Sequence, residues 1–372
     1  MKYRPVKIIG AVLVCAILAF FAWNSLAFQN RWYKDLPVIN FGERIISSPI
    51  SQNGAVFVQT VKGVYSIRLE DMAILWRFPL VGEPLNCDPI IFEDMILAPD
   101  NKGAIVAISI DKGTLLWQSA QPYYSTGGSA IVEAITTRSN FIYTARYSSS
   151  LVAIDALSGN VVWKQPVFDR SSLFLSFYDD TLYLGGDNQL VGFDPQSGEQ
   201  LSSKSFPGHI SAMQTDSSGI YLAVSNDSRV SILLYDPVKD AIVWQKHRVA
   251  YSVDYLVHMG EKLYACGDGV ISMWANSGEV DWAFFDIRTS SSPAFIKNSL
   301  IVRQQKNGDY YQIDINTGVL QNRLTASSSP ENVRSDRDII APVVISDLAL
   351  LNVTSSQLII YNLNLVITQG EH

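Results

Sequence analysis

The segment Leu151-Val-Ala-Ile-Asp155-Ala-Leu-Ser-Gly159-Asn-Val-Val-Trp163 determines how the rest of this chain is interpreted. Residues 152–155 predict a short strand, and Ser158-Gly159 has the composition of a tight turn. Glycine adopts positive φ at such a turn without steric cost. A second short strand follows and ends at Trp163. The segment therefore predicts an antiparallel hairpin whose outer strand carries an indole.

The same pattern recurs along the chain and predicts a repeat protein. Complete or partial copies cover 105–117, 190–202, 236–244, 270–282 and 311–322, and a degenerate first copy ends at Trp76. The tryptophan position therefore falls at residues 76, 117, 163, 202, 244, 282 and 322, with Ser202 and Asn322 in place of an indole. Copies about 40 residues apart suit the four-stranded blade of a β-propeller.

Two further short strands precede each hairpin, for example 173–177 and 181–185 before the copy at 190–202. Each repeat thus predicts four antiparallel strands, named a, b, c and d in chain order. The glycine-containing segments 185–187 and 267–269 fall between strands b and c, where a hairpin turn explains them. After residue 35 no segment has the periodicity of an amphipathic helix.

Seven copies are visible, and an eighth is implied at the C-terminus. Residues 340–345, 348–353 and 357–362 suit strands a, b and c, but a strand d is missing. Residues 36–41 suit a strand d with no partner strands before it, so they are expected to pair into the last blade and close the ring. The predicted fold class is all-β: an eight-bladed β-propeller of four-stranded antiparallel blades, closed by an N-terminal strand. Seven blades are the alternative.

We interpret the repeated residues as a packing device. An indole at the end of strand d reaches the neighbouring blade and stacks on its glycine turn, where no side chain has room. An aspartate in the turn accepts backbone hydrogen bonds; a metal site is excluded because the aspartates lie one per blade around the ring. The predicted set is Trp76, Trp117, Trp163, Trp244 and Trp282 with Gly113, Gly159, Gly198, Gly278 and Gly318, and Asp155, Asp194 and Asp314.

This signature resembles the tryptophan-docking repeat of the pyrroloquinoline-quinone (PQQ)-like, quinoprotein-type β-propellers. Ala153, Asp155, Ser158, Gly159 and Trp163 match it at every marked position, and the resemblance covers about residues 36–367. The length and the N-terminus are most similar to non-enzymatic members, such as the propeller lipoprotein of the outer-membrane assembly (Bam) complex. The resemblance implies a protein-binding scaffold of the bacterial cell envelope that acts in outer-membrane or envelope protein assembly, with an envelope protein as partner.

The alternative functions are a PQQ-dependent dehydrogenase and a small-ligand or glycan sensor that uses the central channel. The dehydrogenases of this superfamily are longer and have a vicinal disulfide, whereas Cys15, Cys87 and Cys266 are far apart here. The four histidines lack metal-ligand spacing, and no phosphate-binding or nucleophile motif is present. We therefore predict no catalysis and no cofactor. The net charge of −7, without a basic stripe, argues against nucleic acid as a partner.

The N-terminus predicts export. Lys2, Arg4 and Lys7 precede an apolar run at 8–28, which as a helix at about 1.5 Å per residue could cross the roughly 30 Å hydrocarbon core. The basic residues place the N-terminus in the cytoplasm and the propeller outside. We expect that the run either stays as an anchor or is cleaved after Ala27 to give a secreted or periplasmic protein. A lipoprotein signal at Cys15 fits poorly, because Val14 is bulky where bacterial lipoprotein signals resemble one another in having a small residue. Predicted domains are 1–35 (signal anchor or signal peptide, and linker), 36–367 (propeller) and 368–372 (tail).

Strand order also predicts a binding face. The d-to-a and b-to-c connections lie on one face of the ring, and the c-to-d turns lie on the other. The two longest connections, 119–129 and 326–338, are both d-to-a. Loops on a rigid scaffold commonly carry binding residues, and tyrosine is enriched in contact surfaces. The candidate partner face therefore comprises Tyr123, Tyr124, Arg146, Tyr147 and Arg170. Alternatively, the two adjacent tyrosines only cover a junction between blades.

Overall fold

The computed structural model describes residues 38–81, 87–120, 132–146, 150–166, 173–226, 229–289, 291–306, 308–324, 343–346, 349–353 and 357–362. The predicted N-terminal helix within residues 1–35 and the predicted tail at 368–372 lie outside these ranges. Within the ranges, no helix has the length and apolar character needed to cross a membrane.

The elements of the described residues are all strands, and they form eight sheets, numbered here in chain order. Sheet 1 contains β2 (Ile50–Gln52), β3 (Ala55–Thr60), β4 (Gly63–Arg68) and β5 (Ile74–Pro79). Sheet 2 contains β6 (Ile90–Phe92), β7 (Met95–Pro99), β8 (Ile105–Ser109) and β9 (Leu115–Gln118). Sheet 3 contains β10 (Val132–Arg138), β11 (Phe141–Arg146), β12 (Ser150–Asp155) and β13 (Val161–Pro166). Sheet 4 contains β14 (Leu173–Tyr178), β15 (Thr181–Gly186), β16 (Gln189–Phe193) and β17 (Gln200–Ser205).

The second half of the chain continues the same order. Sheet 5 contains β18 (His209–Asp216), β19 (Gly219–Asn226), β20 (Arg229–Asp236) and β21 (Ala241–Ala250). Sheet 6 contains β22 (Val253–Met259), β23 (Lys262–Trp274) and β24 (Val280–Arg288). Sheet 7 contains β25 (Ala294–Ile296), β26 (Ser299–Arg303), β27 (Tyr310–Asp314) and β28 (Leu320–Leu324). Sheet 8 contains β29 (Val343–Ser346), β30 (Ala349–Val353), β31 (Gln357–Asn362) and β1 (Val38–Asn40).

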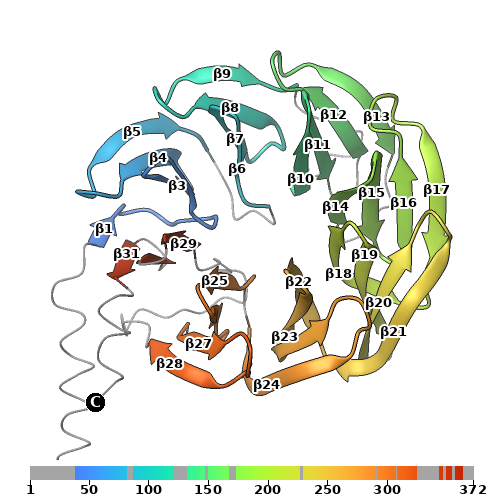
Figure 1. The fold of residues 1–372 in the computed structure, drawn as a ribbon. Coiled ribbons are helices and arrows are strands. Elements are labelled where there is room, and N and C mark those ends of the chain that lie inside the picture. Colours follow the sequence, from blue (N-terminus) through green and yellow to red (C-terminus); the bar gives the residue numbers. More distant parts are fainter. Residues whose placement is uncertain are drawn as a thin grey trace, which may run out of the picture.

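The sheets are arranged around a central axis, with the first strand of each sheet innermost and the last outermost (Figure 1). All paired strands are antiparallel neighbours in this order. In sheet 6 strands b and c form a hairpin that carries the single label β23. Its first half pairs with β22 and its second half pairs with β24, and just beyond its two ends Ala275 N donates to Glu261 O at 3.0 Å. The segment 267–269 lies where the two halves of β23 meet, and Gly269 has a positive φ of +97° there, so the expected hairpin turn is confirmed. The all-β fold of antiparallel sheets, typical of a β-propeller, is confirmed.

Two faces of the ring follow from the strand order. The corner face carries the c-to-d turns, such as 155–160 between β12 and β13, together with the a-to-b turns. The loop face carries the b-to-c and d-to-a connections, such as 187–188 between β15 and β16. Strands a and c run from the loop face to the corner face, and strands b and d run back.

The last sheet joins the two ends of the described chain. β1 pairs antiparallel with β31, with Val38 opposite Ile359 and Asn40 opposite Gln357. This is the pairing that the sequence predicts for the segment without partner strands of its own. The outer strand of sheet 8 therefore comes from the beginning of the chain, and the other three come from its end.

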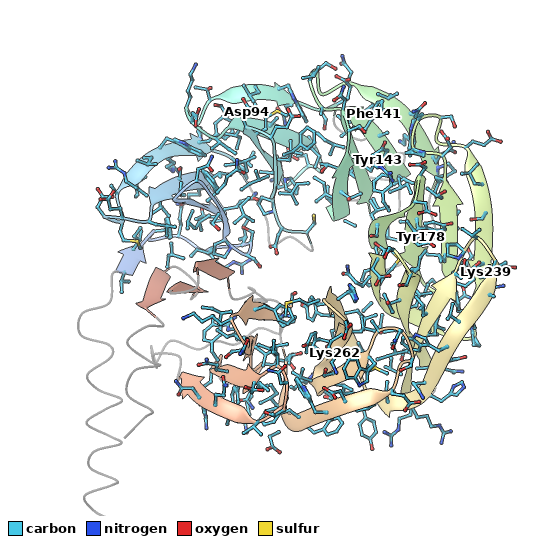
Figure 2. All side chains as sticks on the ribbon, viewed as in Figure 1. Asp94, Phe141, Tyr143, Tyr178, Lys239 and Lys262 are labelled. Atoms are coloured by element: carbon cyan, nitrogen blue, oxygen red, sulfur yellow. The ribbon has the colours of Figure 1, made fainter. Side chains whose placement is uncertain are left out.

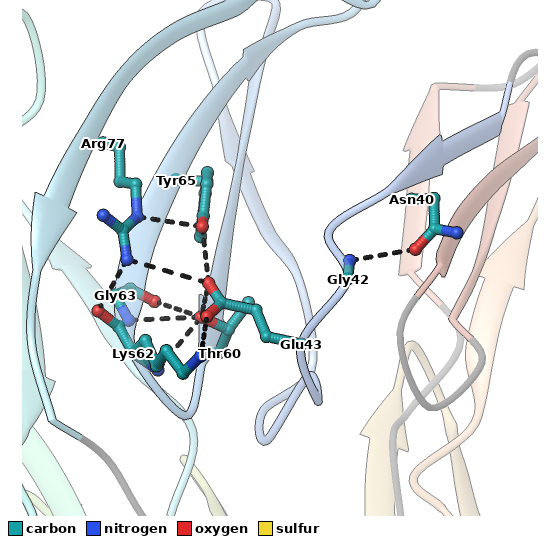
Figure 3. A network of polar contacts seen from close by, with 8 residues as sticks. All are labelled: Asn40, Gly42, Glu43, Thr60, Lys62, Gly63, Tyr65 and Arg77. Atoms are coloured by element: carbon teal, nitrogen blue, oxygen red, sulfur yellow. Dashed lines mark hydrogen bonds and ion pairs between the residues drawn. The ribbon is translucent and has the colours of Figure 1, made fainter.

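A polar cluster fixes the segment that follows β1 to sheet 1 (Figure 3). Glu43 lies with its side chain mostly buried and accepts hydrogen bonds from Thr60 Oγ1 at 2.9 Å and from the Tyr65 hydroxyl at 2.5 Å. Arg77 Nε donates to the same tyrosine oxygen at 2.9 Å, and its guanidinium lies 4.0 Å from the Glu43 carboxylate. Burial, and then the bond to Glu43, raise the pKa of Tyr65, so the phenol stays protonated and donates.

The hydrophobic core lies between neighbouring sheets rather than within one of them. One cluster combines Tyr143, labelled in Figure 2, and Leu151 of sheet 3 with Leu173 and Leu184 of sheet 4, and Trp163 belongs to the same cluster. Strands b and c are buried on both faces, as the pattern BBBBBi of β12 shows, because each sheet is covered by a neighbour on either side. Each sheet is thus stabilised by its two neighbours.

Candidate functional site: corners and a partner-binding face

The five predicted tryptophans contact the next sheet at its c-to-d corner. Each indole N–H donates to a backbone oxygen there at 2.7–2.9 Å. The pairs are Trp76 with Ile110, Trp117 with Ala156, Trp163 with Pro195, Trp244 with Ala275, and Trp282 with Ile315. The contact joins one repeat to the next along the chain, so it fixes the position of each sheet relative to the sheet that follows it.

A glycine lies under each of these indoles. A Cβ atom on any of the five glycines would fall 2.4–2.6 Å from the ring of the tryptophan in the preceding sheet. Their φ angles are also positive, from +61° at Gly113 to +75° at Gly198. Both the turn conformation and the space therefore require glycine at these corners.

The corner aspartates cap these turns. Asp155 Oδ1 accepts from the Ser158 backbone N–H and hydroxyl at 2.8 and 2.7 Å, and Asp314 Oδ1 accepts from Thr317 in the same way. Such bonds favour the charged carboxylate. The Ser158 hydroxyl and N–H hold the pKa of Asp155 below its usual value, and the Ser197 N–H and hydroxyl do so for Asp194.

A β-bulge, which the sequence did not indicate, immediately precedes each tryptophan position and orients the side chain there. In sheet 3, Ala153 pairs with Trp163 and Ile154 pairs with Val161, so Val162 has no partner across the strands. The same shift precedes the tryptophan position in sheets 1 to 7. A bulge bends the strand and redirects its side chains, and it also makes an outer edge unsuitable for pairing with another strand.

The corner of sheet 5 carries no tryptophan and has a side chain in place of glycine. Ser202 occupies the tryptophan position of sheet 4, and the next corner has Asp240 where the five corners under an indole have glycine. Asp240 keeps the left-handed conformation, with φ +48°. Its carboxylate accepts from Lys204 Nζ and from the Tyr235 hydroxyl, both at 2.7 Å. A side chain is accommodated here because no indole lies on this corner.

This pairing gives a prediction for a double-mutant cycle. Ser202→Trp alone is expected to destabilise the fold by about 1–3 kcal/mol, because the new ring overlaps the Asp240 side chain. Combined with Asp240→Gly, the indole gains the space that it has elsewhere, and we expect a favourable coupling of about 1 kcal/mol or more. Urea denaturation of the four proteins measures it. Additive effects would contradict the pairing of indole and glycine.

The predicted partner residues lie almost entirely outside the described ranges. Tyr123, Tyr124, Tyr147 and Arg170 are outside them, and Arg146 is the last residue of β11, where this strand reaches the loop face. Their role as a contact patch stays a prediction.

A second part of the loop face, in sheets 5 and 6, lies within the described residues. The outer strands β21 and β24 have 10 and 9 residues, against 4–6 in β9, β13 and β17. Both carry a large bulge near the loop face: Ser231 faces the three residues 247–249, and Gly269 faces the three residues 285–287. The extra residues enlarge this part of the face.

Aromatic and basic side chains are exposed there. Tyr251 and Phe285 are 62% and 61% exposed. The Arg229 guanidinium lies 3.7 Å from the Tyr251 ring centre and donates to its hydroxyl at 3.0 Å, so the two side chains hold one another in place. Arg248, within the bulge of β21, has a positive φ of +55°. We name Arg229, Arg248, Tyr251 and Phe285 the loop-face patch.

Comparison with known proteins agrees with this architecture. A family model described as outer membrane protein assembly factor BamB matches residues 29–173 and 179–364. The chain belongs to this family. The BamB proteins most similar to it include those of Burkholderia pseudomallei, 27% identical over 42% of this chain and 44% of the relative, and Moranella endobia, 22% identical over 41% and 42%. The aligned part spans less than half the length of these curated relatives.

The BamB fold is also found among solved structures. BamB from Moraxella catarrhalis superposes with a TM-score of 0.68 and 12% identity, over 88% of this chain and all of that chain. A computationally designed protein, Ika8, superposes with a TM-score of 0.69 and 13% identity over 86% of this chain. Identities this low establish the shared fold and nothing more specific.

Proposed function

We propose that this member of the BamB family is a non-catalytic scaffold of the bacterial cell envelope that binds another envelope protein during outer-membrane or envelope protein assembly. We propose further that the eight sheets are the blades of one closed ring and that residues 1–35 anchor it to the cell membrane. The family match supports the assembly role. The observation that carries the proposal is the loop-face patch, because it exposes two large aromatic side chains beside arginines on one part of the loop face.

The composition of the patch is that of a protein contact surface. Tyrosine, phenylalanine and arginine are enriched in such surfaces, and a few of them usually supply most of the binding free energy. Arg229 and Tyr251 are already held against one another, so little side-chain entropy is lost when a partner covers them. The predicted residues Tyr123, Tyr124, Arg146, Tyr147 and Arg170 belong to the same face by strand order and would extend the surface.

Affinity capture from detergent-solubilised membranes tests the proposal. We expect the wild-type chain to retain an envelope assembly protein, and the combined change Arg229→Ala, Tyr251→Ala and Phe285→Ala to reduce its recovery about tenfold or more. The matched control is Leu157→Ala with Val238→Ala, since both side chains are exposed on the corner face.

The outcome separates the two parts of the loop face. Equal recovery with the triple variant, together with a loss for Tyr123→Ala, Tyr124→Ala and Arg146→Ala, would move the site to the predicted patch. Equal recovery with both sets, or no partner with the wild type, would contradict the proposal.

A further inference from the structure

The direction of β1 determines from which face the N-terminal segment approaches the ring. β31 is a strand c, so it runs from the loop face to the corner face, and its partner runs the other way. Asn40 pairs with Gln357 at the start of β31, whereas Val38 pairs with Ile359, nearer its corner-face end. The chain therefore enters sheet 8 from the corner face and runs toward the loop face.

The connection between the proposed anchor and the ring is short. The apolar run ends at Phe28 and β1 begins at Val38, so the segment 29–37 joins them. At no more than about 3.3–3.6 Å per residue, this segment reaches roughly 30 Å when fully extended. The corner-face end of sheet 8 is thus held close to the point where the chain leaves the membrane.

The corner face does not have the character of a lipid-binding surface. Leu157, Val238 and Val319 are exposed at its turns, as membrane contact would need. Carboxylates lie beside them, however, and the pKa of Asp155 and that of Asp194 are held low by hydrogen bonds from their own turns. These residues stay charged near neutral pH and are repelled by anionic lipid head groups. The connection, and not adhesion to lipid, sets the position of the ring.

We infer that the anchored protein holds its corner face toward the membrane and presents its loop face away from it. The inference rests on the proposed anchor and deepens the proposed function. It assigns as partner a water-exposed, extramembrane part of an envelope protein, reached from the side opposite the anchor, rather than a membrane-embedded surface.

Energy transfer to labelled lipids tests the orientation in the full chain reconstituted in vesicles. One donor dye is placed at Val319→Cys, on the corner face, or at Lys306→Cys, on the loop face. Both residues are exposed and lie in connections between strands of sheet 7, next to sheet 8. Cys15 is replaced by serine, and Cys87 and Cys266 are buried. A second pair, Val238→Cys and Tyr251→Cys, repeats the comparison in sheet 5, farther from the point of attachment.

We expect stronger transfer from residue 319 than from residue 306, and from residue 238 than from residue 251. Proteolytic cleavage in the segment 29–37 should abolish transfer at all four positions. Equal or reversed transfer would overturn the orientation, failure of the chain to associate with vesicles would overturn the anchor, and transfer that survives cleavage would show that the ring itself binds lipid. None of these results depends on partner capture, which tests the proposed function separately.

Discussion

Replacing Trp163 by alanine is expected to lower the free energy of unfolding by about 3–5 kcal/mol. The indole is only 9% exposed, donates to Pro195 O at 2.9 Å and lies on Gly198 of the next sheet. Truncation removes this contact area, leaves a cavity between sheets 3 and 4, and leaves the Pro195 carbonyl with the longer hydrogen bond from the Tyr143 hydroxyl at 3.2 Å. Urea denaturation followed by circular dichroism measures the loss.

Trp274 supplies the matched control. It is also a corner residue, but it is 37% exposed and its ring is covered by the Lys262 ammonium instead of a neighbouring sheet. Trp274→Ala should therefore cost about 1 kcal/mol or less. A Trp163→Ala midpoint equal to that of the wild type, or to that of Trp274→Ala, would refute the claim that the indole holds the sheets together.

Adding one carbon atom to Gly198 is expected to be nearly as damaging. Gly198→Ala places a Cβ 2.6 Å from Trp163 Cδ2 at a φ of +75°. The left-handed backbone costs about 1–2 kcal/mol for alanine, and the overlap with the indole adds about 1–3 kcal/mol. The total of about 2–5 kcal/mol is measured by the same denaturation experiment.

Gly260 separates the cost of the left-handed backbone from the cost of the overlap with the indole. Its φ is +61°, yet nothing lies within 4 Å of a Cβ built on it. Gly260→Ala should thus show the conformational cost alone, about 1–2 kcal/mol. If the two alanine variants were equally stable, the indole of Trp163 would not need the space above Gly198.

The repeat made most of the fold predictable. Glycine and tryptophan positions about 40 residues apart identified the hairpins, and the segment containing Val38 could be assigned to the last sheet because it parallels strand d of the others. Such patterns are visible in sequence because each repeat solves the same packing problem with the same residues.

Other features leave no such trace in the sequence. Val162, the unpaired residue of the bulge in sheet 3, is apolar like its neighbours, so composition does not mark it. The loop-face patch was missed because Tyr251 follows a long strand directly and Phe285 lies inside one, whereas attention to long connections favoured Tyr123 and Tyr124. A contact surface built on extended strands is set by strand length and register, which tertiary packing decides.

The pairing of β1 with β31 has a consequence for the order in which the chain folds during its synthesis. Hairpins within a single sheet can form as soon as their own residues are available, but the partner of Val38 is Ile359, near the other end of the chain. After synthesis β1 must wait, unpaired, until the residues of β31 have been produced. Completion of the ring is therefore a late event, and a chain interrupted before β31 leaves sheet 8 without the strand to which β1 pairs.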